Sequence, residues 1–280
     1  MAGLPKSRLP MTLHSFDEAI ALTPRDDNSF TGCTSPAYAN MVGPFGGTTA
    51  ATMLQAALQH PERLGQPIAL TVNFASAVAE GEFEVHARAA RTNRSTQHWL
   101  IEMVQQGQTV STASAVFAQR RSTWSRPEAM PPEEVPAPET LRSADTSRRP
   151  AWVRRYDMRF IEGGMPEPFD AVEQPHSRTC AWVRDEPARS LDHASLAALC
   201  DSFFPRVFIR RRKPAPIGTV TMTTYFHADE ALLAAQADRH VLCCARAMNF
   251  RDGYFDQSAE VWSDSRELLA STHQMVYFRE

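Results

Sequence analysis

Two kinds of hydrophobic pattern occur along the chain, and each occurs twice. Residues 43–62 and 190–208 place apolar side chains in successive turns, which is typical of a helix buried on much of its surface. Each helix is followed by four runs of alternating apolar and polar residues, as in strands. These runs are 67–78, 81–93, 96–107 and 108–120, then 217–229, 239–250, 253–264 and 266–280. Their spacing predicts an antiparallel meander in each half.

Residues 122–150 interrupt this pattern, because they are rich in Pro, Ser and charged residues and have almost no aliphatic periodicity. We interpret them as a linker between an N-terminal unit, 1–121, and a C-terminal unit, 151–280. Two further strand-like segments, 151–164 and 177–187, open the second unit. Each helix must bury its apolar surface against the sheet beside it. The sequence therefore predicts an α+β chain in which two helix-wrapped antiparallel sheets pack as a pseudo-dimer.

Composition excludes several classes of function. The net charge of −3 and the pI of 6.3 give no basic field for nucleic acid. No apolar run approaches the roughly 20 residues of a membrane span, and the N-terminus lacks a long apolar core, so we expect a cytoplasmic protein without membrane contact. The five unpatterned cysteines predict structural thiols. No spacing of a metal site, P-loop or dinucleotide fingerprint occurs, which predicts no metal and no cofactor.

Gln274 is the first candidate for chemistry, because it interrupts the apolar closing strand and needs hydrogen-bond partners there. When the closing strands of the two halves are aligned, Ala115 falls on Gln274, which indicates a task performed once per chain. Asp201 lies on the apolar stripe of the helix predicted over 190–208, although an Asp near a helix end can also simply reach solvent. Thr219 is a third candidate and would share a strand face with Thr221, but threonine favours strands anyway.

An Asp, a Thr and a Gln together can activate a water molecule. A carboxylate such as Asp201 can accept a proton from water while a hydroxyl and an amide orient that water. Such a site could attack a thioester, whose thiolate leaves easily. The developing oxyanion needs backbone N–H donors, which the glycine-led helix start at Gly46 and Gly47 provides, unless these glycines only allow a tight turn.

A basic segment lies between Asp201 and Thr219 in the sequence. Arg210, Arg211 and Arg212 could hold the phosphates of coenzyme A, and a solvated loop is the alternative interpretation.

The chain resembles the acyl-CoA thioesterases of the tandem hotdog superfamily, close to the bacterial thioesterase II branch. The likeness lies in GPFGGTTAATMLQAAL (43–58), ARTNRSTQHWLIEMVQQGQTVSTASAVF (90–117), LAALCDSFFP (196–205) and GYFDQSAEVWSDSRELLASTHQMVYFRE (253–280). Each motif alone is loose, but their order and spacing are fairly specific. Together they span most of the chain outside the first 25 residues and the linker.

This resemblance implies a double hotdog fold and hydrolysis of acyl-CoA to free acid and CoA, in fatty acid metabolism. In that family an Asp, a Ser or Thr and a Gln position the hydrolytic water, and these catalytic positions fall on Asp201, Thr219 and Gln274. An Asp-His pair often follows the family's threonine, whereas Thr221 and Met222 stand here. This departure leaves Thr221 as an alternative hydroxyl.

Two rival functions fit the same fold. One is a non-catalytic acyl-CoA or lipid-binding hotdog protein. The other is a hydratase or dehydratase, which ranks last because its usual His with an acidic partner has no matching pattern here. We also expect that exposed sheet edges could pair with a second copy and form a homo-oligomer.

Overall fold

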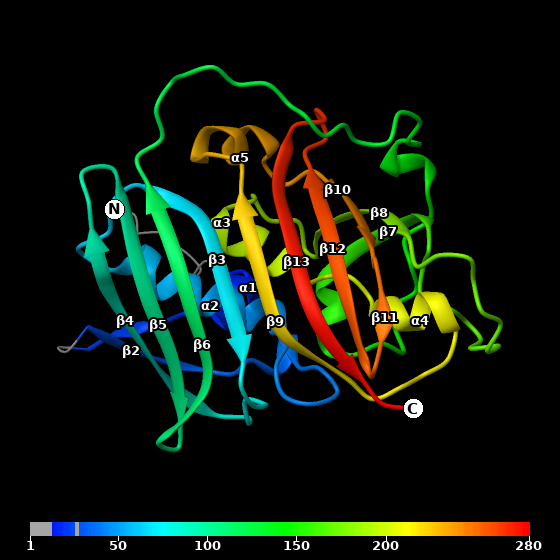
Figure 1. The fold of residues 1–280 in the computed structure, drawn as a ribbon, viewed down its shortest axis with the longest axis horizontal. Coiled ribbons are helices and arrows are strands. Elements are labelled where there is room, and N and C mark those ends of the chain that lie inside the picture. The colour runs from blue at the N-terminus through cyan, green and yellow to red at the C-terminus, as the bar shows by residue number, and fades with distance from the viewer. Residues whose placement is uncertain (1–12, 26–27) are drawn as a thin grey trace, which may run out of the picture.

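The structure, a computed structural model, describes residues 13–25 and 28–280 (Figure 1). Its α-helices are α1 (Ser15–Ala19), α2 (Gly46–Gln59), α3 (His193–Leu199), α4 (Arg206–Arg211) and α5 (Glu230–Gln236). The 3₁₀ turns are η1 (Pro36–Tyr38), η2 (Pro138–Thr140) and η3 (Ala151–Arg155). Within the described ranges, no helix is both long and apolar enough to cross a membrane.

The strands of the N-terminal half are β1 (Thr23–Pro24), β2 (Ser29–Cys33), β3 (Gln66–Phe74), β4 (Glu82–Thr92), β5 (Thr96–Gln105) and β6 (Gln108–Ala118). Those of the C-terminal half are β7 (Tyr156–Glu162), β8 (Thr179–Asp185), β9 (Ile217–Phe226), β10 (Val241–Arg246), β11 (Phe250–Arg251), β12 (Tyr254–Trp262) and β13 (Leu268–Phe278). All pairings are antiparallel, in one sheet of order β1-β2-β4-β5-β6-β3-β9-β13-β12-β10-β8-β7, with β11 paired to β12 outside this path.

The strand order corrects the predicted meander. The first strand after each central helix, β3 or β9, pairs with the last strand of its half, β6 or β13, and not with the strand that follows it. Alternation shows which face of a strand is buried, but it does not specify the strand's partner. As a result β3 and β9 are neighbours at the centre, and they join the two halves into one continuous sheet.

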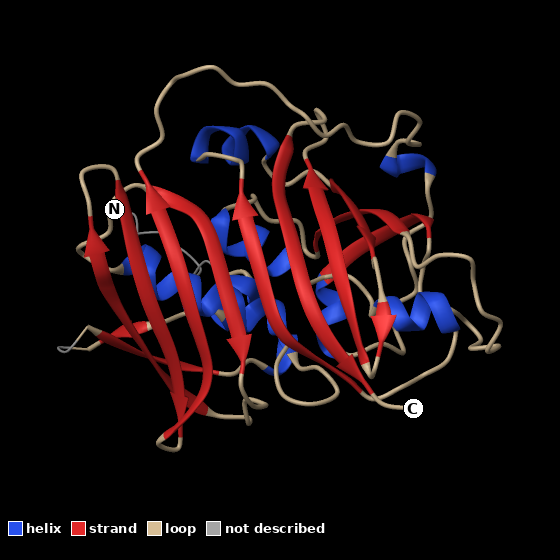
Figure 2. Ribbon diagram, in the orientation of Figure 1, coloured by secondary structure: helices blue, strands red, loops and turns tan. Residues whose placement is uncertain are grey.

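The sheet curves around the central helices, which lie together on its concave face (Figures 1 and 2). Along α2 the side chains of Ala50, Ala51, Met53 and Leu54 are fully buried, and α2 packs against α3. This arrangement confirms the predicted α+β class with two helices wrapped by antiparallel strands.

The predicted helix over 190–208 is interrupted. The sequence predicts Ser190 or Asp192 as its cap, and the helix begins at the N-cap Asp192, whose carboxylate accepts from the Ser195 amide in a capping box. However, α3 ends at Leu199 and α4 begins only at Arg206. Pro205 ends the turn between them, because proline lacks an N–H and disfavours a helical residue before it.

The start of α2 lacks a capping side chain, although the sequence predicts Thr48 or Thr49, directly after the glycines, as its cap. Neither Thr48 nor Thr49 caps this helix, because its N-cap is Phe45, which has no side-chain cap. The Thr48 hydroxyl instead donates to the Phe45 carbonyl at 2.7 Å. The first N–H groups of α2 are therefore not satisfied by a capping side chain.

One pair of cysteines contradicts the expectation of free thiols. Cys180 on β8 and Cys244 on β10 are directly opposite one another and form a disulfide. Their separation of 64 residues gives no local signal of this pairing. Cys33, Cys200 and Cys243 are free.

Residues 122–150 leave β6, pass over one end of the sheet and reach the outer face of the C-terminal half (top of Figure 1). Two contacts fix them there: Trp182 donates its Nε1–H to the Pro136 carbonyl at 2.9 Å, and Arg159 donates to the Pro138 carbonyl at 2.8 Å. They cover a cavity of about 190 Å³ on that face, which Trp262 also lines. The boundaries at 121 and 150 stay a prediction.

Candidate active site

Asp201 and Gln274 meet on the concave side of the sheet. Asp201 lies in the turn that follows α3, and Gln274 lies in the middle of β13 with only 3 % of its surface exposed. The Gln274 Nε2 donates to Asp201 Oδ1 at 2.9 Å and approaches the Cys200 carbonyl at 3.4 Å. Two residues that are distant in the sequence therefore share one hydrogen bond.

The partners of Gln274 determine which way its amide points. A carboxylate and a carbonyl only accept, so the NH₂ group must face Asp201 and Cys200. The Gln274 Oε1 is then left facing Thr219, whose hydroxyl lies 3.5 Å away, long for a hydrogen bond. Asp201, Gln274 and Thr219 thus form one polar group on the concave face.

A β-bulge brings Thr219 to this group. Strict alternation predicted that Thr219 and Thr221 share a strand face, and this is wrong, because the β9–β13 register shifts between Met275 and Val276. Val220 is left exposed at 39 %, and Thr219 turns towards Gln274. The Thr221 hydroxyl instead donates to the Val72 carbonyl of β3 at 3.1 Å.

The carboxyl group of Asp201 is half-buried, and its environment favours the protonated form. Burial raises the pKa of Asp201 from 3.8 to about 7, while the hydrogen bonds from the Gln274 side chain and the Gly47 backbone hold it lower than burial alone would. A carboxyl with a pKa near neutrality can take up a proton and release it again at physiological pH.

The start of α2 completes the group from the other half of the chain. A Cβ atom on Gly46 would lie 2.7 Å from Asp201 Oδ2, and one on Gly47 would lie 2.6 Å from the Ala198 carbonyl. Glycine therefore lets the helix N-terminus approach the Asp201 carboxylate closely at Gly46 and the backbone of α3 closely at Gly47. The partial positive charge of that terminus faces the site.

Family models match both halves of the chain. Residues 35–118 match the model of the acyl-CoA thioesterase N-terminal domain, and residues 127–278 match that of the C-terminal domain.

The chain belongs to the acyl-CoA thioesterase family.

Solved structures confirm the double hotdog fold of this thioesterase-family chain. A hot dog fold protein of unknown function from Alicyclobacillus acidocaldarius is 49 % identical over 96 % of this chain and 99 % of its own, with a TM-score of 0.91. The acyl-CoA thioesterase II TesB2 from Mycobacterium marinum is 17 % identical over 94 % and 98 %, with a TM-score of 0.74. A tesB protein from Mycobacterium avium subspecies paratuberculosis is 17 % identical over 95 % and 98 %, with a TM-score of 0.75. No curated protein matches the chain.

Within this family member, the three candidate arginines are already paired. Arg210 bonds to Glu173 at 2.8 Å, Arg211 to Glu280 at 2.5 Å and Arg212 to Asp170 at 2.6 Å. The phosphates of a bound coenzyme would have to compete with these carboxylates. The structure thus places the arginines together near the end of α4 but in ion pairs.

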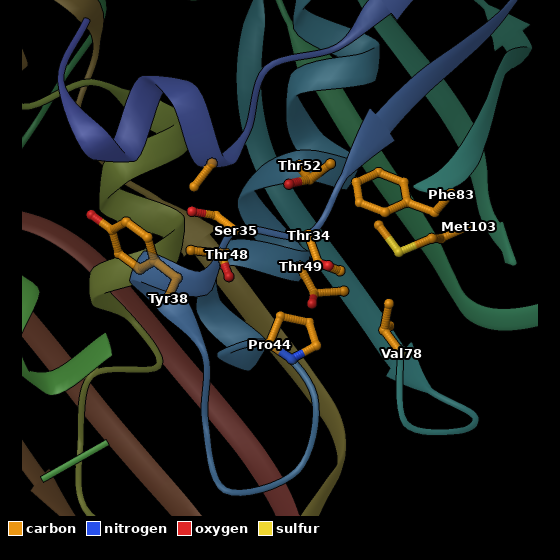
Figure 3. Close-up of a pocket in the computed structure, with 11 residues that line it drawn as sticks. Thr34, Ser35, Tyr38, Pro44, Thr48, Thr49, Thr52, Val78, Phe83 and Met103 are labelled. Carbon is orange, nitrogen blue, oxygen red and sulfur yellow. The ribbon is translucent and has the colours of Figure 1, made fainter. Parts of the chain in front are cut away.

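A small cavity of about 20 Å³ lies against the first turn of α2, on the side of Thr48, Thr49 and Thr52 (Figure 3). Tyr38 and Phe83 also line it. This volume suits a single water molecule and not an acyl chain. Asp201 is approached instead by Gly46 of the same turn.

The sequence prediction missed two residues near the site. Arg206 lies in the same basic stretch of sequence as Arg210, Arg211 and Arg212, yet it is fully buried. Gln257 on β12 lies directly opposite Gln274. The position of Arg206 among apolar neighbours was a signal for its burial. Gln257 has no comparable local signal, since only the register reveals its position.

The N-terminal half fills the corresponding position with apolar groups. Ala115 on β6 pairs with Trp99 on β5, as Gln274 pairs with Gln257 in the C-terminal half. His60, which directly follows α2, packs its ring against the Trp99 indole at 4.8 Å between centroids. An indole and a methyl group therefore occupy the place that two amides occupy in the other half.

Within the described residues, no group of His, Cys, Asp and Glu side chains could hold a metal ion.

Proposed function

We propose that the chain hydrolyses acyl-CoA thioesters to a free carboxylic acid and CoA. Family membership supports thioester hydrolysis in general. The observation that carries the finer proposal is the 2.9 Å hydrogen bond between Gln274 and a carboxyl, Asp201, whose pKa is raised to about 7 at the glycine start of α2.

In the proposed mechanism Asp201 is the general base. It takes a proton from water while the water oxygen bonds to the thioester carbon, and Gln274 and Thr219 orient that water. The carbon–sulfur bond then breaks, and the proton held by Asp201 can pass to the departing thiolate. Because a thiolate is a good leaving group, the reaction needs no further acid.

The backbone N–H groups at Gly46 and Gly47 are the proposed oxyanion donors. In the resting site the Gly47 amide stabilises the Asp201 carboxylate. Asp201 becomes protonated as negative charge develops on the substrate oxygen. A neutral carboxyl accepts the hydrogen bond from the Gly47 amide less strongly than a carboxylate does. The helix N-terminus can then stabilise the oxyanion.

The substrate's CoA part is proposed to bind near the end of α4. Arg210, Arg211 and Arg212 would exchange their present carboxylate partners for phosphate groups. A cytoplasmic location, a role in fatty acid metabolism and self-association remain predictions.

The test is release of free thiol from a panel of acyl-CoA substrates of different length and branching. We expect turnover of at least one of them by the wild type and its loss in Asp201→Asn and Gln274→Ala. Saturable binding of acyl-CoA without thiol release from any substrate would identify a binding protein instead. Undiminished turnover in both variants would remove the proposed mechanism.

A further inference from the structure

Arg206 is a buried cation without a carboxylate partner in the described parts of the chain. Its side chain has no exposed surface, and no ion pair to it is found there. Burial lowers the pKa of its guanidinium to about 9. Because burying an unpaired charge is costly, the hydrogen bonds of Arg206 must compensate for it.

Within the described residues, the guanidinium bonds only to neutral oxygens. Nε donates to the Phe204 carbonyl at 3.0 Å and to Gln257 Oε1 at 2.9 Å, and Nη2 also donates to Phe204. Nη1 donates to the Ser177 carbonyl at 2.9 Å and to the Thr179 hydroxyl at 2.7 Å. Arg206 therefore links the turn before α4 to the segment leading into β8 and to the centre of β12.

Two of these partners are neighbours of the candidate active site. Phe204 lies in the short turn that begins with Asp201. Gln257 is the register partner of Gln274, so their Cβ atoms lie roughly 5 Å apart on the same face. The guanidinium thus bonds at the same time to Phe204, in the turn of Asp201, and to Gln257, opposite Gln274.

The chemistry of arginine also fixes the orientation of Gln257. A guanidinium has donors and no acceptor, so Gln257 must turn its Oε1 towards Arg206 and its NH₂ group away. Lysine could not reproduce this arrangement, because its ammonium lacks the planar fork that reaches Phe204 and Gln257 together.

We propose that Arg206 is a positioning residue of the active site: through Phe204 and Gln257 it sets the separation between the Asp201 carboxyl and the Gln274 amide. This inference rests on the proposed function of that site. Arg206 itself does not contact the substrate. A misplacement of about 1 Å in such a group can reduce turnover roughly 100-fold.

The first experiment compares thiol release by Arg206→Met, Arg206→Lys and a control, Arg159→Met. Arg159 is a well-bonded arginine on the outer face, where it binds Asp157 and the linker. We expect Arg206→Met to lower kcat about 10- to 100-fold with KM changed less than about 2-fold. Arg206→Lys should lie between it and the wild type. The control should lose thermal stability without any change in kcat.

Substitutions at Gln257 test the contact between Arg206 and Gln257 separately from the contact between Arg206 and Phe204. Gln257→Glu keeps an acceptor for Arg206, so it should retain most of kcat, and its added negative charge should move the acid limb of the pH–rate profile to higher pH. Gln257→Leu removes the hydrogen bond between Arg206 and Gln257 and should lower kcat. If Gln257→Leu has wild-type kcat and pH dependence, positioning through Gln257 is wrong.

The titration of Asp201 provides a readout that does not need turnover. The stability difference between a protein and its Asp201→Asn variant, followed against pH, reports the folded pKa of that carboxyl. We expect this pKa to be higher in the Arg206→Met background, because the hydrogen bond from Gln274 weakens. The same pKa in both backgrounds, together with unchanged kcat, would overturn the inference. An inactive wild type whose Asp201 pKa still depends on Arg206 would refute the proposed function alone.

Discussion

Substitution of Asp201 by Asn should have opposite effects on activity and on stability at alkaline pH. The variant keeps the shape of the side chain but cannot accept the proton from water. Loss of a general base reduces turnover by roughly 10² to 10⁴-fold. At the same time, the buried carboxylate that is unfavourable above neutral pH is removed.

The sign follows from the two pKa values. The carboxyl titrates near 3.8 when the chain is unfolded and at about 7 in the folded protein, so the folded state holds the proton more tightly. Its stabilising effect is fully present below about pH 4 and is lost as the pH rises through about 7. The wild type should therefore become less stable relative to Asp201→Asn across this range.

The magnitude follows from the same values. The difference between 3.8 and 7 corresponds to at most about 4 kcal/mol in the free energy of unfolding. Since Asp201 keeps some contact with solvent, we expect about 2 kcal/mol. For a chain of this length that is a change of about 4 °C in the Tm difference between the two proteins.

The assay has two parts. Thermal unfolding of wild type and Asp201→Asn is measured from pH 4 to 9, and thiol release is measured over the same range. The wild-type kcat/KM should fall on the acid side with an apparent pKa near 7. A Tm difference that does not vary with pH, or an acid limb near pH 4, would refute the argument that burial raises this pKa.

Three further changes probe the neighbours of Asp201. Gln274→Ala should lower kcat and raise the apparent pKa of the acid limb, because a hydrogen bond to the carboxylate is lost; a lower pKa in the pH–rate profile would contradict this. Thr219→Val should reduce kcat by about 3- to 10-fold, the effect of one neutral hydrogen bond, whereas the matched control Thr221→Val should leave kcat unchanged in the same assay. Gly46→Ala should lower kcat/KM with little change in Tm, since its Cβ would lie 2.7 Å from Asp201 Oδ2, and wild-type kinetics in this variant would show that the close approach is unnecessary.

Much of this site could be predicted because its residues violate local patterns. An amide within an apolar strand and a carboxylate within an apolar helix pattern are both unfavourable without a partner, and this indicated Gln274 and Asp201 as candidates. The structure places the two within hydrogen-bond distance. The capping role of Asp192 was equally local, since an N-cap depends only on the following turn.

The remaining features depend on contacts between distant segments. The β-bulge that turns Thr219 towards Gln274 arises from pairing with β13, and alternation along β9 alone predicted a different facing. The link from Arg206 to Gln257 and the Cys180–Cys244 disulfide also form only when strands adopt their final register. The sequence pattern of one segment identifies which of its side chains must be buried. It does not identify the residues that they contact, because those lie in other segments of the chain.

The two helix starts explain why the parts of the site come from different halves. At α3 the carboxylate of Asp192 already accepts a hydrogen bond from the first-turn amide of Ser195. The N-terminus of α3 is therefore capped by a negative charge from its own half. At α2 the N-cap Phe45 supplies no side-chain acceptor, and the terminus faces Asp201 instead.

The N-terminal half thus has a helix start without a capping side chain, and it has Ala115 and the Trp99 indole where the other half has two amides. The C-terminal half has the pair Asp201 and Gln274, but its helix start is capped by Asp192. Neither half contains a complete set. Because α2 packs against α3 across the centre of the molecule, the open terminus of one half meets the polar pair of the other. This division accounts for one candidate site among the described residues of a chain that contains the same folding unit twice.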